Sequence, residues 1–402
     1  MALTETFPLS QRILRMAESA TIKMAQMARD LRAQGHDVIS LSLGEPDFDT
    51  PDHIKEAAAE ALQMGYTKYT PVPGLVALRE AICTKFKRDN DLHFDINQIV
   101  VSNGAKQSVA NVSMALLDEG DEVVILAPYW VSYYEIVRLG GGTPVILKAD
   151  IDQDFKVTPE QLAAAINEKT KFVLFSSPCN PTGSVYTREE LEGLAEVIAR
   201  HEGVYIVADE IYEYINFTGQ HASIGAIDSV RDRTVTINGF SKGFAMTGWR
   251  LGYIGGPAWL AKACAKIQGQ ITSGATAFGQ MAGAKALLGD MEPTHKMREA
   301  FLRRRELVVN GLRAIPGFRV NHPQGAFYIF PDISAYFGKS NGEWTIDSAD
   351  DFCNYLLQVA HVAVVSGSAF GADNCFRISY AASDEQLTEA IKRIKAAVGQ
   401  LN

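Results

Sequence analysis

The sequence lacks the features that would point to a membrane, to nucleic acid or to a disulfide framework. None of its apolar runs approaches the ~18–20 residues that cross a bilayer. Lys and Arg (38) are outnumbered by Asp and Glu (47), so the net charge of −9 argues against a protein that must neutralise phosphates. The five cysteines, Cys83, Cys179, Cys264, Cys353 and Cys375, are odd in number and scattered. We therefore expect reduced, mostly buried thiols and no metal site.

The beginning of the chain, MALTETFPLSQRIL, lacks the basic and apolar segments of a secretion signal, so we expect a cytoplasmic protein. There is no internal repeat and no low-complexity tract. At ~100–200 residues per domain, 402 residues predict two or three domains. Apolar residues make up 47% of the chain and charged residues 21%, which is typical of a globular protein with a large core.

The middle of the chain alternates short apolar runs with amphipathic stretches. This alternation predicts an α/β domain with a mostly parallel sheet that is covered on both faces. The expected strands are Ile99–Ser102, Glu122–Ala127, Pro144–Lys148, Lys171–Ser176, Tyr205–Asp209, Thr234–Asn238 and Leu251–Gly255. The expected helices between them are Lys106–Leu117, Tyr129–Leu139, Pro159–Glu168 and Arg188–Arg200.

The two ends of the chain show longer helical patterns, over 10–33, 293–314 and 384–398, with short apolar segments at 318–321 and 326–330. We expect the ends to pack together as a smaller domain, 1–46 with 300–402, beside a large domain, 47–299. The triplet Arg303–Arg305 lies on a long helix, where such charges usually form a solvated face.

Polar segments follow several of the predicted strands, and ligands of open α/β sheets bind at the carboxyl ends of strands. These segments are Asn103–Gln107, Ser177–Gly183, Asp209–Tyr212 and Asn238–Gly243 with Thr247–Gly252, and a further arginine lies in the short strand pattern Phe376–Ser379. The glycine turn at Gly104 opens a helix whose free N–H groups favour an anion. The glycine spacing matches neither a Walker A loop nor a dinucleotide-binding loop.

Taken in order, the motifs SLGEPDF, SPCNPTG, DEIYE, SKGFAMTGWRLGY and FRISYA resemble the class I aminotransferases of fold type I, which use pyridoxal 5'-phosphate. The resemblance covers essentially the whole chain. It is strongest to the bacterial-type aspartate aminotransferases and their prephenate aminotransferase relatives. It implies a large α/β/α domain and a smaller α+β domain built from both termini.

The resemblance assigns the cofactor ring to a small group of residues. Lys242 matches the lysine that carries the cofactor as a Schiff base and later moves the substrate's Cα proton. Asp209 matches the carboxylate that pairs with the pyridine nitrogen and keeps it protonated. Tyr212 and Asn180 match residues that hydrogen-bond the ring's phenolic oxygen, and Trp130 matches the aromatic residue that stacks on the ring.

The resemblance also implies a phosphate site, because a helix N-terminus and an arginine both favour a dianion. The matching residues are Ser241, Arg250, Gly104, Ala105, Lys106 and Tyr69. Since Tyr69 matches a residue supplied by the neighbouring subunit, we expect a homodimer whose active sites are shared across the interface.

For the substrate, Arg377 matches the residue that binds the α-carboxylate, and Gly44 lets the backbone approach the same group. Some aspartate aminotransferases bind the distal carboxylate with an arginine from the neighbouring subunit, but the corresponding stretch here, 271–276, contains none. In the more similar subgroup this role belongs to the lysine of the Gly-x-Lys turn, here Lys106. Thr21 matches a threonine that accompanies prephenate recognition.

The expected activity is amino-group transfer between aspartate or glutamate and 2-oxo acids, with prephenate as a further acceptor. Three alternatives stay open: an aromatic or other class I aminotransferase, a pyridoxal-phosphate C–S β-lyase on the same fold, and a transcription regulator with an aminotransferase-like domain. The last would need a separate basic DNA-binding domain, whereas the family pattern here begins within about ten residues of the start.

Overall fold

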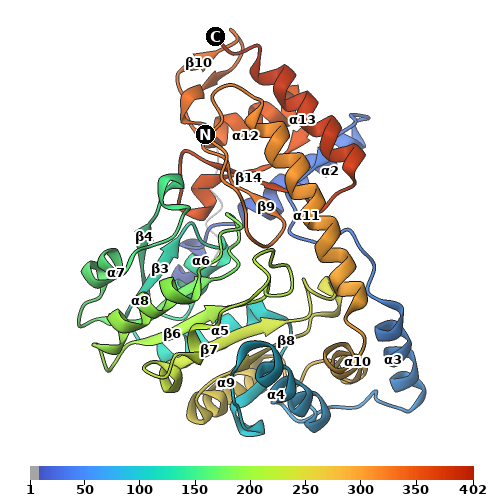
Figure 1. The fold of residues 1–402 in the computed structure, drawn as a ribbon, viewed down its shortest axis with the longest axis vertical. Coiled ribbons are helices and arrows are strands. Elements are labelled where there is room, and N and C mark those ends of the chain that lie inside the picture. Colours follow the sequence, from blue (N-terminus) through green and yellow to red (C-terminus); the bar gives the residue numbers. More distant parts are fainter. Residues whose placement is uncertain (1–8) are drawn as a thin grey trace.

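The computed structural model describes residues 9–402 and contains one large central sheet (Figure 1). The strand order is β2-β8-β7-β6-β5-β3-β4. The strands are β2 (Ile99–Ser102), β3 (Glu122–Ala127), β4 (Thr143–Lys148), β5 (Thr170–Ser176), β6 (Tyr205–Asp209), β7 (Thr234–Gly239) and β8 (Gly252–Gly255). The strands from β4 to β7 run parallel, and β8 is antiparallel to both β7 and β2. The predicted mostly parallel α/β sheet is confirmed.

The strands are apolar throughout because both faces of the sheet are covered. Val123 and Ile125 pack on one side, while Val124 and Leu126 pack on the other. On the first face lie α5 (Ala105–Leu116), α6 (Ser132–Leu139) and α9 (Ala258–Ile271), and on the second lie α7 (Pro159–Ala165) and α8 (Arg188–Ala199). Near the β2 edge lie α3 (Asp52–Gln63), α4 (Val76–Asn90) and α10 (Ala277–Leu288).

A second core joins the two ends of the chain (Figure 1). Its helices are α2 (Ala20–Ala33), α11 (Glu292–Arg313), α12 (Ala349–Val359) and α13 (Asp384–Val398). Its short strands are β1 (Ile39–Ser40), β9 (Tyr328–Ile329), β12 (Val362–Ala363), β13 (Val365–Ser366) and β14 (Phe376–Ser379), with β10 (Lys339–Ser340) and β11 (Thr345–Ile346) in a separate hairpin. The helix α11 runs between the two cores without a break at residue 300, so the predicted domain boundaries stay a prediction.

Local sequence signals set several helix ends. Thr187 accepts a hydrogen bond from the backbone N–H of Glu190, whose side chain bonds back to Thr187, so α8 begins with a complete capping box. Thr158 and Gln161 do the same at the start of α7. Among residues 9–402 no helix combines the length and the apolar character needed to cross a membrane.

The expected helix over 10–33 is wrong as a single element, because it is divided into α1 (Gln11–Leu14) and α2. In the gap, the Arg15 carbonyl oxygen accepts a hydrogen bond from Arg138 at 2.9 Å, and the Ala17 N–H donates to Glu135 at 3.4 Å. These side chains of α6 replace helical hydrogen bonds, so tertiary contacts override the local periodicity.

The expected helix over 129–139 begins later, at Ser132, because the Tyr129 N–H donates to the Phe370 carbonyl oxygen at 3.1 Å. The solvated face expected at Arg303–Arg305 is wrong for two of the three arginines. Arg304 is 7% exposed and forms a two-pronged ion pair with Asp47 at 2.7 and 2.9 Å.

Arg305 is also 7% exposed, and it donates to the Pro323 carbonyl oxygen at 2.9 Å. The Arg303 side chain stays 62% exposed, as expected. The expected reduced thiols are confirmed: all five cysteines are free, three of them buried and two half-buried.

Candidate active site

A cavity of about 280 Å³ lies at the carboxyl ends of β5 and β6, beside the loop that follows β7, between the sheet and the second core. Every residue predicted for the site lines this cavity except Gly104 and Tyr69. The predicted residues that line it are Thr21, Gly44, Ala105, Lys106, Trp130, Asn180, Asp209, Tyr212, Ser241, Lys242, Arg250 and Arg377. The structure thus brings together side chains that are up to 356 positions apart in the sequence (377 − 21 = 356).

Asp209 ends β6 and is 4% exposed. One carboxylate oxygen accepts a hydrogen bond from the Tyr133 hydroxyl at 2.7 Å, and the other accepts one from the Ile211 N–H at 3.2 Å. Asp209 forms no ion pair with any residue in the described part of the chain. Burial raises the pKa of Asp209 to about 6, so the site holds a carboxylate that lacks a cation.

Lys242 follows β7 and lies at the centre of the cavity, where its ammonium nitrogen donates to the Gly44 carbonyl oxygen. A side chain at Gly44 would collide with the Tyr328 hydroxyl, so only glycine brings this carbonyl so near. Burial, reinforced by the positive charge of Arg377, lowers the pKa of Lys242 to about 8. The amine is therefore partly neutral, and so nucleophilic, near neutral pH.

Two groups that bind anions meet at one end of the cavity. Gly104 has φ +82° and stands at the N-cap of α5, so the free N–H groups of the first helical turn begin beside it. A Cβ atom at position 104 would strike the Arg250 guanidinium, which shows how closely the arginine approaches this helix end. Ser241, 7% exposed, also lines the cavity. Together they form a cradle for an anion.

Arg377 lies on β14 and is 2% exposed. It donates to the Asn180 side-chain oxygen at 2.9 Å and to the Ser42 carbonyl oxygen, and its guanidinium lies 4.6 Å from the centre of the Tyr328 ring. Its Nε atom is buried without a hydrogen-bond partner. Burial lowers the pKa of Arg377, and no carboxylate in residues 9–402 pairs with it, so this rigid cation is left to bind one from solution.

Lys106 and Thr21 lie farther along the same cavity. The Lys106 ammonium is 5.0 Å from the centre of the Trp130 ring, and burial together with the Arg250 charge lowers the pKa of Lys106. The Thr21 hydroxyl is buried and has no hydrogen-bond partner among the described residues. Both side chains therefore have hydrogen-bonding capacity left for a polar group of a ligand.

Tyr69 lies outside the cavity and is 98% exposed. Two tyrosines inside the cavity were not predicted as site residues. Tyr133 bonds to Asp209, and the Tyr328 hydroxyl is 2.7 Å from that of Tyr212. The signal for Tyr133 is its place three residues after Trp130, whose ring its own ring contacts edge to face at 5.4 Å between centroids. Tyr328 carries no such signal beyond its apolar segment.

A family-wide sequence model for "Aminotransferase class I and II" matches residues 36–394. The chain is 48% identical over 391 residues to an aspartate/prephenate aminotransferase of Cereibacter sphaeroides, covering 96% of this chain and 98% of that protein. It is 47% identical over 395 residues to a bifunctional aspartate aminotransferase and glutamate/aspartate-prephenate aminotransferase of Petunia hybrida, covering 97% of this chain and 82% of that protein.

Solved structures resemble the whole chain as well. The aspartate aminotransferase of Rhizobium meliloti superposes with a TM-score of 0.96 at 44% identity, covering 99% of this chain and 100% of the other. That of Thermus thermophilus with maleate gives a TM-score of 0.91 at 41% identity, covering 98% of this chain and 100% of the other. The likeness therefore includes both cores and the cavity between them.

Proposed function

The chain belongs to the class I and II aminotransferases, and we propose that it moves amino groups between aspartate or glutamate and 2-oxo acids with bound pyridoxal 5'-phosphate. One observation carries the proposal. A half-buried lysine with a lowered pKa and a buried carboxylate without a cation line the same small cavity, next to an anion cradle. A cofactor with an aldehyde, a basic ring nitrogen and a phosphate matches this set of groups.

The residues fit pyridoxal phosphate group by group. Asp209 would face the ring nitrogen, and an opposite charge at ~4 Å with an effective dielectric of about 20 contributes roughly 4 kcal/mol before desolvation. The phosphate would lie against the backbone of the turn formed by Gly104, Ala105 and Lys106, beside the Ser241 and Arg250 side chains, which leaves the Lys106 side chain free. When bound, the cofactor supplies a carbonyl carbon for the amino group and a ring that withdraws electrons.

The remaining residues hold the ring and the substrate. Trp130 would stack on the ring, and Tyr212 and Asn180 would bond its phenolic oxygen. With a pKa of about 8, the Lys242 amine takes and returns a proton at its nitrogen without a large energetic penalty near neutral pH. Arg377 would bind the substrate's α-carboxylate beside Gly44, while Asn180 keeps the guanidinium in place.

Lys106 and Thr21 would bind the distal part of the substrate. No other cationic side chain besides Lys106, Lys242, Arg250 and Arg377 lines the described cavity, and the last three have roles already. Lys106 would therefore pair with the distal carboxylate of aspartate or glutamate, and Thr21 would add a hydroxyl contact. The relatives named for both aspartate and prephenate support prephenate as a further substrate, with arogenate as its product.

We propose a homodimer because of Tyr69. Its side chain is almost fully exposed, so within one subunit it does not reach the anion cradle. In the proposed dimer Tyr69 completes the phosphate site of the other subunit. A monomer with full activity in sedimentation experiments would contradict this arrangement.

The function is tested by mixing the cofactor-loaded enzyme separately with aspartate, glutamate, phenylalanine and arogenate. We expect aspartate and glutamate to change the visible absorbance of the bound cofactor, because each passes its amino group to it. Glutamate with prephenate should yield arogenate. No absorbance change with any amino acid would refute the transaminase proposal, and absence of arogenate would refute the prephenate part alone.

The variant Lys106→Ala tests the proposed ion pair between Lys106 and the distal carboxylate of the substrate. It should raise KM for dicarboxylates about tenfold or more, since a charge-assisted bond is lost, and change KM for phenylalanine far less. Lys148→Ala, at an exposed lysine that ends β4, is the matched control and should leave both constants unchanged. An equal rise in KM for dicarboxylates and for phenylalanine would contradict the assignment of Lys106.

A further inference from the structure

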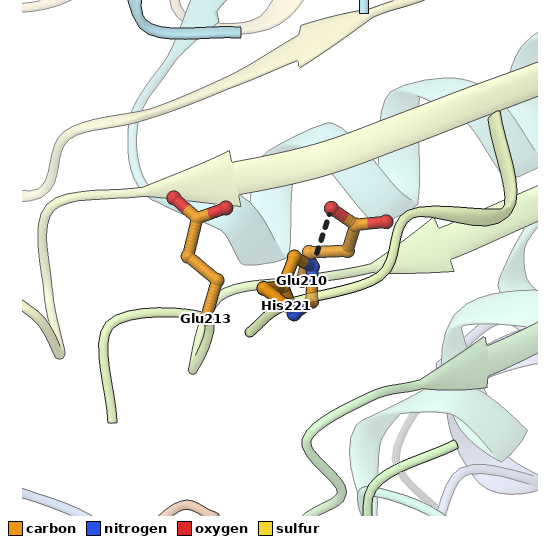
Figure 2. Close-up of side chains that lie close together, drawn as sticks. All are labelled: Glu210, Glu213 and His221. Atoms are coloured by element: carbon orange, nitrogen blue, oxygen red, sulfur yellow. Dashed lines mark hydrogen bonds and ion pairs between the residues drawn. The ribbon is translucent and has the colours of Figure 1, made fainter. Parts of the chain in front are cut away.

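A second group of buried charges lies behind the segment that carries Asp209 and Tyr212. Glu210 and Glu213 alternate with residues that line the cavity, and each carboxyl side chain is 3% exposed (Figure 2). Figure 2 shows the His221 ring against Glu210, with its Nε2 atom 2.9 Å from a carboxylate oxygen. The ligand-type atoms of these three residues lie within 4.8 Å of one another.

This spacing would suit a metal ion, but the cluster already has a cation of its own. Lys85 of α4 is fully buried and pairs with the Glu213 carboxylate. The same ammonium donates to the Asn90 side-chain oxygen at 2.6 Å. The Asn90 amide in turn donates to Glu213 at 2.8 Å and to Glu210 at 3.1 Å. Lys85 and Asn90 thus stand where an ion would have to bind.

Two basic side chains, Lys85 and His221, face the two carboxylates of the cluster. Burial alone would lower the pKa of His221, but the neighbouring Glu210 carboxylate outweighs this and raises it, which favours the imidazolium. The Ser223 hydroxyl adds a bond to Glu210 at 2.6 Å. We call Lys85, Asn90, Glu210, Glu213 and His221 the rear clamp.

The rear clamp connects the last turn of α4 to the segment that follows β6. Nearby, the Tyr214 hydroxyl donates to Asp89 at 2.6 Å, which ties the same two elements together again. On its other side this segment presents Asp209, Ile211 and Tyr212 to the cavity. Its geometry is therefore set from behind by charged bonds that never touch the cavity.

We propose that Lys85 is a positioning residue of the active site: through the rear clamp it fixes the segment that holds Asp209 and Tyr212 against the cofactor. The inference rests on the proposed pyridoxal phosphate site. It goes beyond that site because Lys85 and Asn90 contact neither the cavity nor any residue assigned to the cofactor.

The test compares the wild type, Lys85→Met, the charge-balanced pair Lys85→Met with Glu213→Gln, and the control Lys156→Met. Lys156 is a half-buried lysine that pairs with Glu190 away from the cavity. For each protein, three quantities are measured: the melting temperature without cofactor, the Kd for pyridoxal phosphate by absorbance titration, and the circular dichroism of the bound cofactor.

We expect Lys85→Met to lower the melting temperature, because it leaves Glu213 buried without a partner. The charge-balanced pair should regain most of that stability but still bind pyridoxal phosphate about tenfold or more weakly, with altered circular dichroism. The control should match the wild type. If Lys85→Met does not fold, the charge-balanced pair decides the question.

A charge-balanced pair with wild-type Kd and wild-type circular dichroism would overturn the proposal and leave the rear clamp a source of stability only. A wild-type protein that binds no pyridoxal phosphate would instead overturn the proposed function. The two failures are therefore distinguishable.

Discussion

Two groups of buried charges lie on opposite sides of the segment from Asp209 to Glu213. Behind it, the rear clamp pairs Glu213 with the Lys85 ammonium and Glu210 with His221, whose pKa that carboxylate raises. In front of it, in the cavity, the buried Asp209 and Arg377 and the half-buried Lys242 have no ion partners among the described residues, and desolvation moves all three pKa values toward the neutral form. Charges that serve the fold are matched within the chain, whereas charges that serve a ligand are left for the ligand to match.

This comparison predicts opposite outcomes for lysines on the two sides. Lys242→Ala should lower amino-group transfer by on the order of 10⁴-fold or more, because both the cofactor attachment and the proton carrier are lost. Stability without cofactor should not fall much, since the variant removes a desolvated amine that has no ion partner. Turnover assays and thermal melts measure both effects. Residual activity within a hundredfold of the wild type would show that Lys242 is neither the attachment point of the cofactor nor the proton carrier.

The two sides also differ in their carboxylates. Asp209→Asn should reduce turnover by about 10³-fold, which corresponds to the roughly 4 kcal/mol expected for a charge opposite the ring nitrogen. The same variant should be more stable than the wild type at pH 8 without cofactor, because a lone buried charge is removed.

Glu213→Gln is the matched variant behind the segment and should instead lose about 3–5 kcal/mol of stability, since it leaves Lys85 unpaired. Chemical unfolding of the cofactor-free proteins measures the stability change of both variants. The comparison between the two sides fails if Asp209→Asn is destabilised as much as Glu213→Gln.

The residues that face the cavity were predictable from the sequence, whereas the rear clamp was not. Asp209 ends a strand, and Asn180 and Lys242 each follow one; parallel strands bring their carboxyl ends to one edge, and the family resemblance assigns these three residues to one site. Lys85 precedes Glu213 by 128 positions (213 − 85 = 128) and lies within a helix, where nothing local distinguishes it from a solvated lysine. Its role depends on how the end of α4 packs against the segment that follows β6.

The same limit explains the other misses. Arg304 and Arg305 belong to a charged helix pattern, yet Asp47 and the Pro323 carbonyl oxygen approach them from distant segments. Tyr133 lies three residues after the predicted Trp130, but its bond to Asp209 depends on the approach of α6 to the end of β6. A single sequence shows which elements form, but not which buried polar groups those elements bring together.

The lone charge of Asp209 also predicts a pH dependence. Its folded pKa of about 6 lies above its ordinary 3.8, so the folded protein binds this proton more tightly than the unfolded chain. The contribution of Asp209 to stability is therefore greatest below about pH 4 and is lost as the pH rises through about 6.

At ~1.36 kcal/mol per pH unit, this loss amounts to about 3 kcal/mol. Urea unfolding of the cofactor-free protein between pH 4 and 7 measures it, and Asp209→Asn supplies the control because that variant lacks the titrating group. Identical pH profiles for the two proteins would show that Asp209 does not titrate in this window.

The smallest effect is expected at the hydroxyl that faces Asp209 from α6. Tyr133→Phe removes a 2.7 Å hydrogen bond to the carboxylate but keeps the ring that packs against Trp130. Because that bond stabilises the charged form, its loss should raise the pKa of Asp209 further and lower turnover about tenfold, or ~1.4 kcal/mol. In the cofactor-free protein the pH at which the Asp209 contribution to stability is lost should therefore move upward, which urea unfolding between pH 4 and 8 would measure. Tyr129→Phe, outside this bond, is the matched control. A lower rate with an unmoved pH profile of unfolding would mean that Tyr133 acts through packing and not through the charge of Asp209.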